Sequence, residues 1–104
     1  MSQSLVYITA GDMEEAERIG AALVEDNLAA CVNIIPGMKS MYRWEGKVES
    51  SQEVVVIAKT RSDLVQRLTL RVADVHSYEV PCVAAVPIQG GNQAFLQWIT
   101  EETS

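Results

Sequence analysis

Short apolar runs alternate along this chain with segments in which apolar residues recur every three or four positions. The first run, Leu5 to Ile8, is rich in β-forming residues and predicts a strand. From Asp12 to Val24 the apolar residues fall on one helical face, and acidic residues crowd the first turn, where the helix dipole favours them. Asp12 followed three residues later by Glu15 has the form of a capping box, so we expect a helix to begin here.

The next region is strand-like on both sides of a turn at Trp44-Glu45-Gly46-Lys47, where glycine can supply a positive φ, and this pattern predicts a hairpin. The arm from Val32 to Trp44 exceeds the usual strand length of about five or six residues. Pro36-Gly37 interrupts the arm and favours a bulge or an edge position. We therefore expect the hairpin to project beyond the sheet that anchors it.

Both faces of this projecting arm carry large apolar side chains. Tyr42 and Trp44 share one face, and Met41 lies on the other. In a monomer these side chains would leave an exposed apolar patch, which is typical of a surface that meets a partner. The pattern therefore predicts oligomerisation.

Four further segments complete the pattern. They are a continuously apolar central strand (Val54 to Ala58), a second amphipathic helix (about Arg61 to Val75), a strand closed by Pro87 (Val83 to Val86), and a last helix capped by Asn92 (Gln93 to Thr100). The order predicts an α+β fold of the ferredoxin-like split βαβ type, with two helices on one face of an antiparallel sheet and an extra C-terminal helix. We expect residues 1–104 to form a single domain.

The charge of the chain narrows the choice of partners. A formal net charge of −6 repels polyphosphate, so we expect no nucleic-acid partner. The first twenty residues show neither a leader peptide nor a membrane-spanning run, which favours a cytoplasmic protein. The two cysteines, Cys31 and Cys82, lack the C-x-x-C spacing, and we expect both to be free thiols that pack as small hydrophobic residues.

Candidate chemistry gathers in residues 76 to 82, HSYEVPC. His76 either interacts as a cation with the last carbonyls of the preceding helix or binds a ligand or metal. Imidazole suits copper and zinc, and Glu79 or Cys82 could add a second ligand, although one histidine per chain is too few for a closed site without further subunits. Pro81 restrains the entry to the following strand.

Other side chains allow alternative sites. Tyr42, Trp44 and Trp98 could line a pocket or simply pack, and Lys59 could bind an anion or end its strand at the surface. The chain has no G-x-S-x-G, phosphate-binding G-x-x-x-x-G-K or H-E-x-x-H motif, so we do not expect an enzyme. A nucleophilic pair of Cys82 and His76 is a remote alternative.

Four motifs in this order, AACVNIIPGMKSMYRWEGKVE, KT, HSYEVP and FLQW, resemble the CutA family of divalent-cation tolerance proteins over Leu5 to Trp98. The resemblance implies a ferredoxin-like subunit in a homotrimer, whose long hairpins extend each sheet into that of a neighbour. It also implies weak binding of a divalent cation, with Cu(II) favoured, and no established reaction. An alternative is a module like the PII signalling proteins, which binds a small ligand or a partner protein in clefts between subunits.

The residues that the resemblance places in the cleft are Tyr42, Trp44, Lys59, His76, Tyr78 and Glu79. We group Tyr42, Trp44, Lys59 and Tyr78 as candidates for ligand contact, and His76, Glu79 and Cys82 as candidates for metal contact. The chain departs from the family at two of the neighbouring positions. Ser77 stands where the family commonly has proline, which predicts a looser turn, and Cys82 stands where an acidic residue is frequent.

Overall fold

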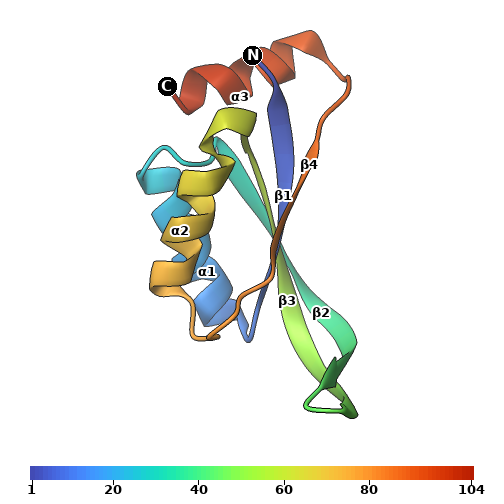
Figure 1. The fold of residues 1–104 in the computed structure, drawn as a ribbon. Coiled ribbons are helices and arrows are strands. Elements are labelled where there is room, and N and C mark those ends of the chain that lie inside the picture. Colours follow the sequence, from blue (N-terminus) through green and yellow to red (C-terminus); the bar gives the residue numbers. More distant parts are fainter.

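The computed structural model describes all 104 residues as a four-stranded antiparallel sheet with two helices on one face and a third at one end (Figure 1). The sheet order is β2-β3-β1-β4, which confirms the predicted ferredoxin-like arrangement. The elements are β1 (Gln3–Ala10), α1 (Met13–Glu25), β2 (Cys31–Trp44), β3 (Lys47–Arg61), a 3₁₀ turn (Ser62–Leu64), α2 (Val65–Val75), β4 (Val83–Pro87) and α3 (Gln93–Glu102). None of these helices combines the length and apolar character needed to cross a membrane.

Helix α1 begins as the capping pattern predicts. The side chain of Asp12 accepts a hydrogen bond from the Glu15 amide at 2.8 Å. Farther along the helix, Gly20 lets α1 approach β2 closely, because a β-carbon at this position would lie 2.8 Å from a methyl group of Val32. Asn92 caps α3 in the same way by accepting from the Phe95 amide.

The core lies between the sheet and helices α1 and α2. Alternate side chains of β1 and β3 point into it, including Val6, Ile8 and Val56, all with no exposed surface. Leu23 of α1 and Leu68 of α2 close the core from the helical side. The predicted central strand was too short, because β3 continues past the buried Val54–Ala58 run into the polar hairpin.

The β2–β3 hairpin projects from the sheet, as the sequence predicts (Figure 1). Its turn residues Glu45 and Gly46 have φ values of 49° and 79°, so both occupy the left-handed region and not glycine alone. The register shifts between Ile35 and Met38, which places the predicted bulge at Pro36-Gly37. The radius of gyration, 14.1 Å, exceeds the value of about 13 Å for a compact chain of this length, and the hairpin explains the difference.

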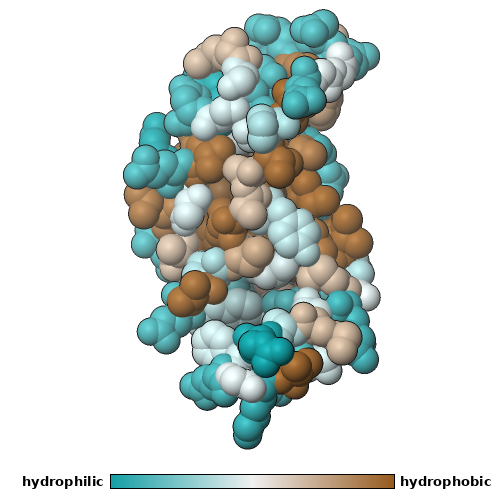
Figure 2. Space-filling view, turned by 45° about the vertical axis from the view of Figure 1, so that its right-hand side comes forward, coloured by the Kyte–Doolittle hydropathy of each residue, from teal (hydrophilic) through white to brown (hydrophobic).

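The face of the sheet opposite α1 and α2 remains largely uncovered. Helix α3 covers only one end of this open face, where Phe95 and Trp98 stack with their ring centroids 5.7 Å apart. Large apolar side chains stay exposed beyond it, among them Tyr7 and Val86 on the sheet and Met41, 71% exposed, on the hairpin. Figure 2 shows hydrophobic side chains reaching the surface over the middle of the molecule.

Candidate functional site

A pocket of about 510 Å³ lies between the hairpin and the segment that links α2 to β4. Its volume falls in the range of small-molecule sites. Residues from β1, β2, β3 and the linking segment contribute to it: Thr9, Tyr42, Arg43, Trp44, Glu53, Tyr78, Glu79, Val80 and Cys82.

The hairpin supplies one side of this pocket. Tyr42 and Trp44 are two residues apart on β2, so their side chains lie on the same face. Glu53 of β3 points to this face as well, because its cross-strand partner Met38 belongs to it. Trp44 is 58% exposed and Tyr42 is 43% exposed, so both rings are open to a ligand. The Tyr42 hydroxyl lies 3.4 Å from the hydroxyl of Ser51 on β3.

Tyr78 forms the opposite side and is fixed in place by a carboxylate. Its hydroxyl donates a hydrogen bond of 2.8 Å to Oε2 of Glu53. Burial of the phenol and this hydrogen bond raise the pKa of Tyr78 above its ordinary value, and the negative charges of Glu53 and Glu15 act in the same direction. Tyr78 is therefore a neutral hydrogen-bond donor at physiological pH.

The side chain of His76 is fully buried, and its hydrogen-bond partners are Thr9 and Tyr78 rather than the carbonyls at the end of α2. Its Nδ1 accepts a hydrogen bond of 3.0 Å from the Tyr78 amide, so the proton of the neutral ring lies on Nε2. Nε2 then donates to the carbonyl of Thr9 at 2.7 Å. The Nε2 bond thus holds the linking segment against the end of β1, and the Nδ1 bond fixes the turn within that segment.

Glu15 attaches the same segment to helix α1. Its Oε1 accepts from the Gly11 amide at 3.0 Å, and its Oε2 accepts from the Ser77 amide at 2.7 Å. Burial acts to raise the pKa of this carboxyl group, but the hydrogen bonds from Ser77 and Gly11 outweigh burial, so the pKa lies below its ordinary value. A proline at position 77 could not donate the Ser77 hydrogen bond, so this turn has a contact that the prediction of a looser turn overlooked.

The three predicted metal-contacting residues divide into two groups. Glu79 and Cys82 line the pocket, whereas His76 does not and has both nitrogens hydrogen-bonded. No cluster of three or more His, Cys, Asp or Glu side chains within the single chain could hold a metal ion. Neither cysteine forms a disulfide, as predicted, but Cys82 is exposed and Cys31 is half-buried, so the expectation that both pack in the interior was wrong.

The predicted ligand-contacting residues also divide. Tyr42, Trp44 and Tyr78 line one pocket, and Lys59 does not. The Lys59 ammonium group donates to the side chain of Asn33 on β2 and lies 6.0 Å from the centre of the Phe95 ring. Lys59 therefore points toward α3 on the open face of the sheet and away from the pocket.

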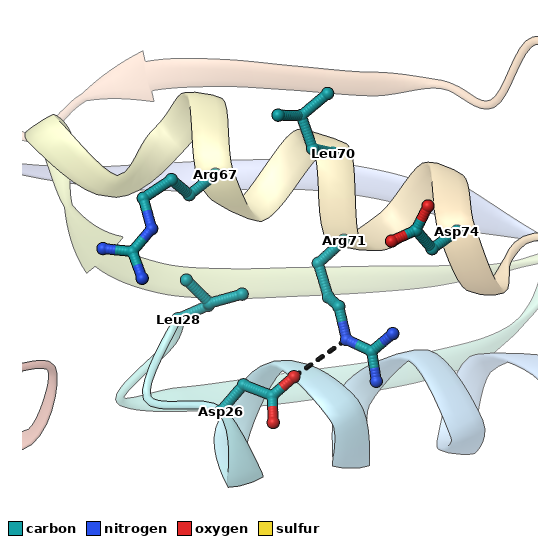
Figure 3. A pocket seen from close by; sticks show the side chains of 6 residues that line it. All are labelled: Asp26, Leu28, Arg67, Leu70, Arg71 and Asp74. Atoms are coloured by element: carbon teal, nitrogen blue, oxygen red, sulfur yellow. Dashed lines mark hydrogen bonds and ion pairs between the residues drawn. The ribbon is translucent and has the colours of Figure 1, made fainter.

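A second hollow of about 510 Å³ lies on the other side of the molecule, between the end of α1 and helix α2 (Figure 3). Arg71 of α2 forms a salt bridge of 2.8 Å to Asp26, and Arg67 extends beside Leu28 one turn away. This hollow is shallow, and its basic side chains are balanced by Asp26 and Asp74.

Two important residues were missed by sequence reasoning. Glu53 lies in a polar stretch of the hairpin and had no recognisable signal. Glu15 was noticed only as part of the capping box, because its partner Ser77 is 62 positions away.

Comparison with known proteins places this geometry in a family. A family model described as "CutA1 divalent ion tolerance protein" matches residues 4–102. The divalent-cation tolerance protein CutA of Archaeoglobus fulgidus is 49% identical over 98 residues, which cover 94% of this chain and 95% of that protein. The solved structure of the divalent cation tolerance protein (Cut A1) from Thermus thermophilus superposes with a TM-score of 0.96 at 44% identity, covering 98% of this chain and 99% of that one.

The plant relatives are longer than this chain, and their names describe them as chloroplastic. The chloroplastic protein CutA 1 of Oryza sativa subsp. japonica is 44% identical over 99 residues, which are 95% of this chain. This chain spans only 56% of its length and 54% of that of the Arabidopsis thaliana protein. Because the solved Archaeoglobus fulgidus relative is described as periplasmic, the cytoplasmic location remains a prediction.

The family model covers nearly the whole chain, and one relative of nearly equal length is about half identical. The names of the Archaeoglobus fulgidus and Thermus thermophilus relatives describe tolerance of divalent cations. The chain belongs to the CutA1 divalent ion tolerance protein family.

Proposed function

We propose that this protein is a cytoplasmic homotrimer that binds a divalent metal ion weakly, with copper preferred, and contributes to metal tolerance by binding rather than by catalysis. Family membership supports the general role in divalent-cation tolerance. The observation that supports metal binding is that Glu79 and Cys82 line the same pocket. Glu79 offers oxygen ligands and Cys82 offers a sulfur ligand.

The projecting hairpin and the uncovered sheet face support the oligomer. Met41 and Trp44 on the hairpin and Val86 on the sheet are more than half exposed, which is unfavourable in an isolated chain. Pairing of the hairpin with a neighbour would cover Met41, Val86 and the open edges of β2 and β4. Light scattering at micromolar concentration should give three times the mass of the 11.4 kDa chain, and a monomeric mass would exclude the trimer.

The metal would bind where two subunits meet, because one chain offers too few ligands. Glu79 and Cys82 would bind it directly, and the neighbouring copy would add the remaining ligands. His76 was predicted as a third ligand, but it must break a hydrogen bond to Thr9 or Tyr78 before it can bind a metal. We therefore assign His76 to holding the linking segment in place.

Equilibrium dialysis against Cu(II) tests these roles. Cys82→Ser and Glu79→Gln should each weaken copper binding by about tenfold, since loss of one ligand interaction of about 1.4 kcal/mol corresponds to that factor. Cys31→Ser is the matched control, because Cys31 lies outside the pocket. If His76→Ala alone weakens binding and the other two variants do not, the assignment of ligands is wrong.

The alternative is a PII-like module that holds a small ligand between subunits, and the aromatic lining of the pocket favours it. A ligand that binds only the folded trimer raises its midpoint of thermal unfolding. A thermal-shift screen of metals and small metabolites separates the two functions. Shifts by metals alone would exclude this alternative.

A further inference from the structure

Three aromatic side chains surround the pocket in a way that metal binding does not require. Tyr42 and Trp44 come from the hairpin, and Tyr78 from the linking segment is held by Glu53. The face of an aromatic ring carries partial negative charge and attracts organic cations, most strongly for tryptophan. Trp44 is the most exposed of the rings on the hairpin side, so its face is accessible.

The charges in the pocket favour a cation as well. Glu53 and Glu79 contribute two negative charges and Arg43 one positive charge, so the lining carries a net charge of −1. The net charge of the whole chain, −6, has the same sign. Tyr78 occupies Oε2 of Glu53, and no side chain of this protein donates to the other carboxylate oxygen. That oxygen is available to an ammonium group.

The size of the pocket suits an organic ligand better than a bare ion. A volume of about 510 Å³ holds a small molecule with apolar substituents. Trp44 and Val80 give a metal ion no available lone pairs, but they do contact methyl and methylene groups favourably. We propose that this pocket binds an organic ammonium ion, with its charge beside Glu53 and its apolar part against Trp44 and Tyr42.

This inference does not require metal binding at Cys82. Glu79 is the one side chain that both ligands would use, so a metal and an ammonium ion would compete for its carboxylate. Copper binding should persist when Trp44 is replaced, because tryptophan is not a metal ligand.

Calorimetric titration with choline and with its neutral isostere, in which carbon replaces the ammonium nitrogen, tests the proposal on the intact protein. Choline should bind at least about tenfold more tightly than the isostere, because only choline gains the attraction of the rings and carboxylates. n-Butylammonium is titrated in parallel. If it binds more strongly than choline, the preferred organic ammonium ion is a primary one.

Three variants locate the site. Trp44→Leu and Glu53→Gln should each reduce binding of the preferred ammonium ion several-fold. Glu49→Gln removes the same charge from the same face of β3 outside the pocket, and it should leave binding unchanged. Circular dichroism verifies that each variant is folded.

Two outcomes would overturn the proposal: neither ammonium ion binds at millimolar concentration, or the neutral isostere binds equally well. A wild type that binds an ammonium ion but no copper would overturn the proposed metal function and leave this inference intact.

Discussion

Replacing Glu15 with glutamine removes the carboxylate that attaches the pocket-forming segment to helix α1. The carboxylate accepts one backbone hydrogen bond on each oxygen, from Gly11 at 3.0 Å and Ser77 at 2.7 Å. Glutamine has a single acceptor oxygen, so one amide loses its partner and faces the NH₂ group instead. A hydrogen bond to a charged group contributes about 1.5–3 kcal/mol, and we expect Glu15→Gln to lower the free energy of unfolding by about 2–3 kcal/mol at pH 7.

The effect should depend on pH in a defined direction. The pKa of Glu15 in the folded protein lies below its ordinary value of 4.5, so the stabilisation is complete above pH 4.5 and is lost as the pH falls through the folded pKa. The difference in unfolding free energy between wild type and Glu15→Gln should therefore shrink in acid.

Urea denaturation followed by tryptophan fluorescence measures this difference, with the protein concentration held constant because the proposed oligomer would contribute to stability. Glu14→Gln is the matched control, because Glu14 is exposed in the same helical turn. This control should cost only about 0.3–1 kcal/mol through the helix dipole. Equal losses in the two variants, or a difference that does not change between pH 7 and pH 3, would refute the role of Glu15.

Three further predictions concern the pocket, the core and the hairpin. Glu53→Gln should lower the pKa of the Tyr78 phenol, because it removes the charge that opposes ionisation. Ultraviolet absorbance during alkaline titration measures the ionisation of tyrosine, and an unchanged titration curve would contradict the role of Glu53. Leu68→Ala should lower the unfolding free energy by about 2–5 kcal/mol, whereas Leu70→Ala on the exposed side of α2 should change it by less than about 0.5 kcal/mol. Urea denaturation compares the two variants, and equal losses of stability would contradict the burial pattern. Gly46→Ala should cost about 1–2 kcal/mol, because alanine is strained at a φ of 79°, and a loss no larger than in an exposed glycine-to-alanine control would contradict this turn geometry.

Local patterns predicted the elements of the fold well because the physical causes are themselves local. The turn at Glu45-Gly46, the bulge at Pro36-Gly37 and the helix cap at Asp12 each depend on residues close together in the sequence. Element boundaries were less accurate. β1 begins at Gln3, before its apolar run, because Gln3 and Ser4 pair with the end of β3.

The candidate site was predictable only in part, because its chemistry depends on contacts between distant segments. The family resemblance grouped Tyr42, Trp44 and Tyr78 as candidates for ligand contact, and the fold brings these three side chains to the lining of one pocket. The sequence could not show that the Thr9 carbonyl and the Tyr78 amide occupy the nitrogens of His76. Nor could it show that Lys59 contacts Asn33 rather than the pocket, since that depends on the register of β2 and β3.

A crystal of the protein soaked with Cu(II), with copper located by its anomalous scattering, tests the central claim most directly. The account predicts a homotrimer with copper at a subunit boundary, within about 2.5 Å of Cys82 Sγ or a Glu79 carboxylate oxygen. Copper bound only away from these side chains, or no ordered copper in crystals at saturating concentration, would contradict it.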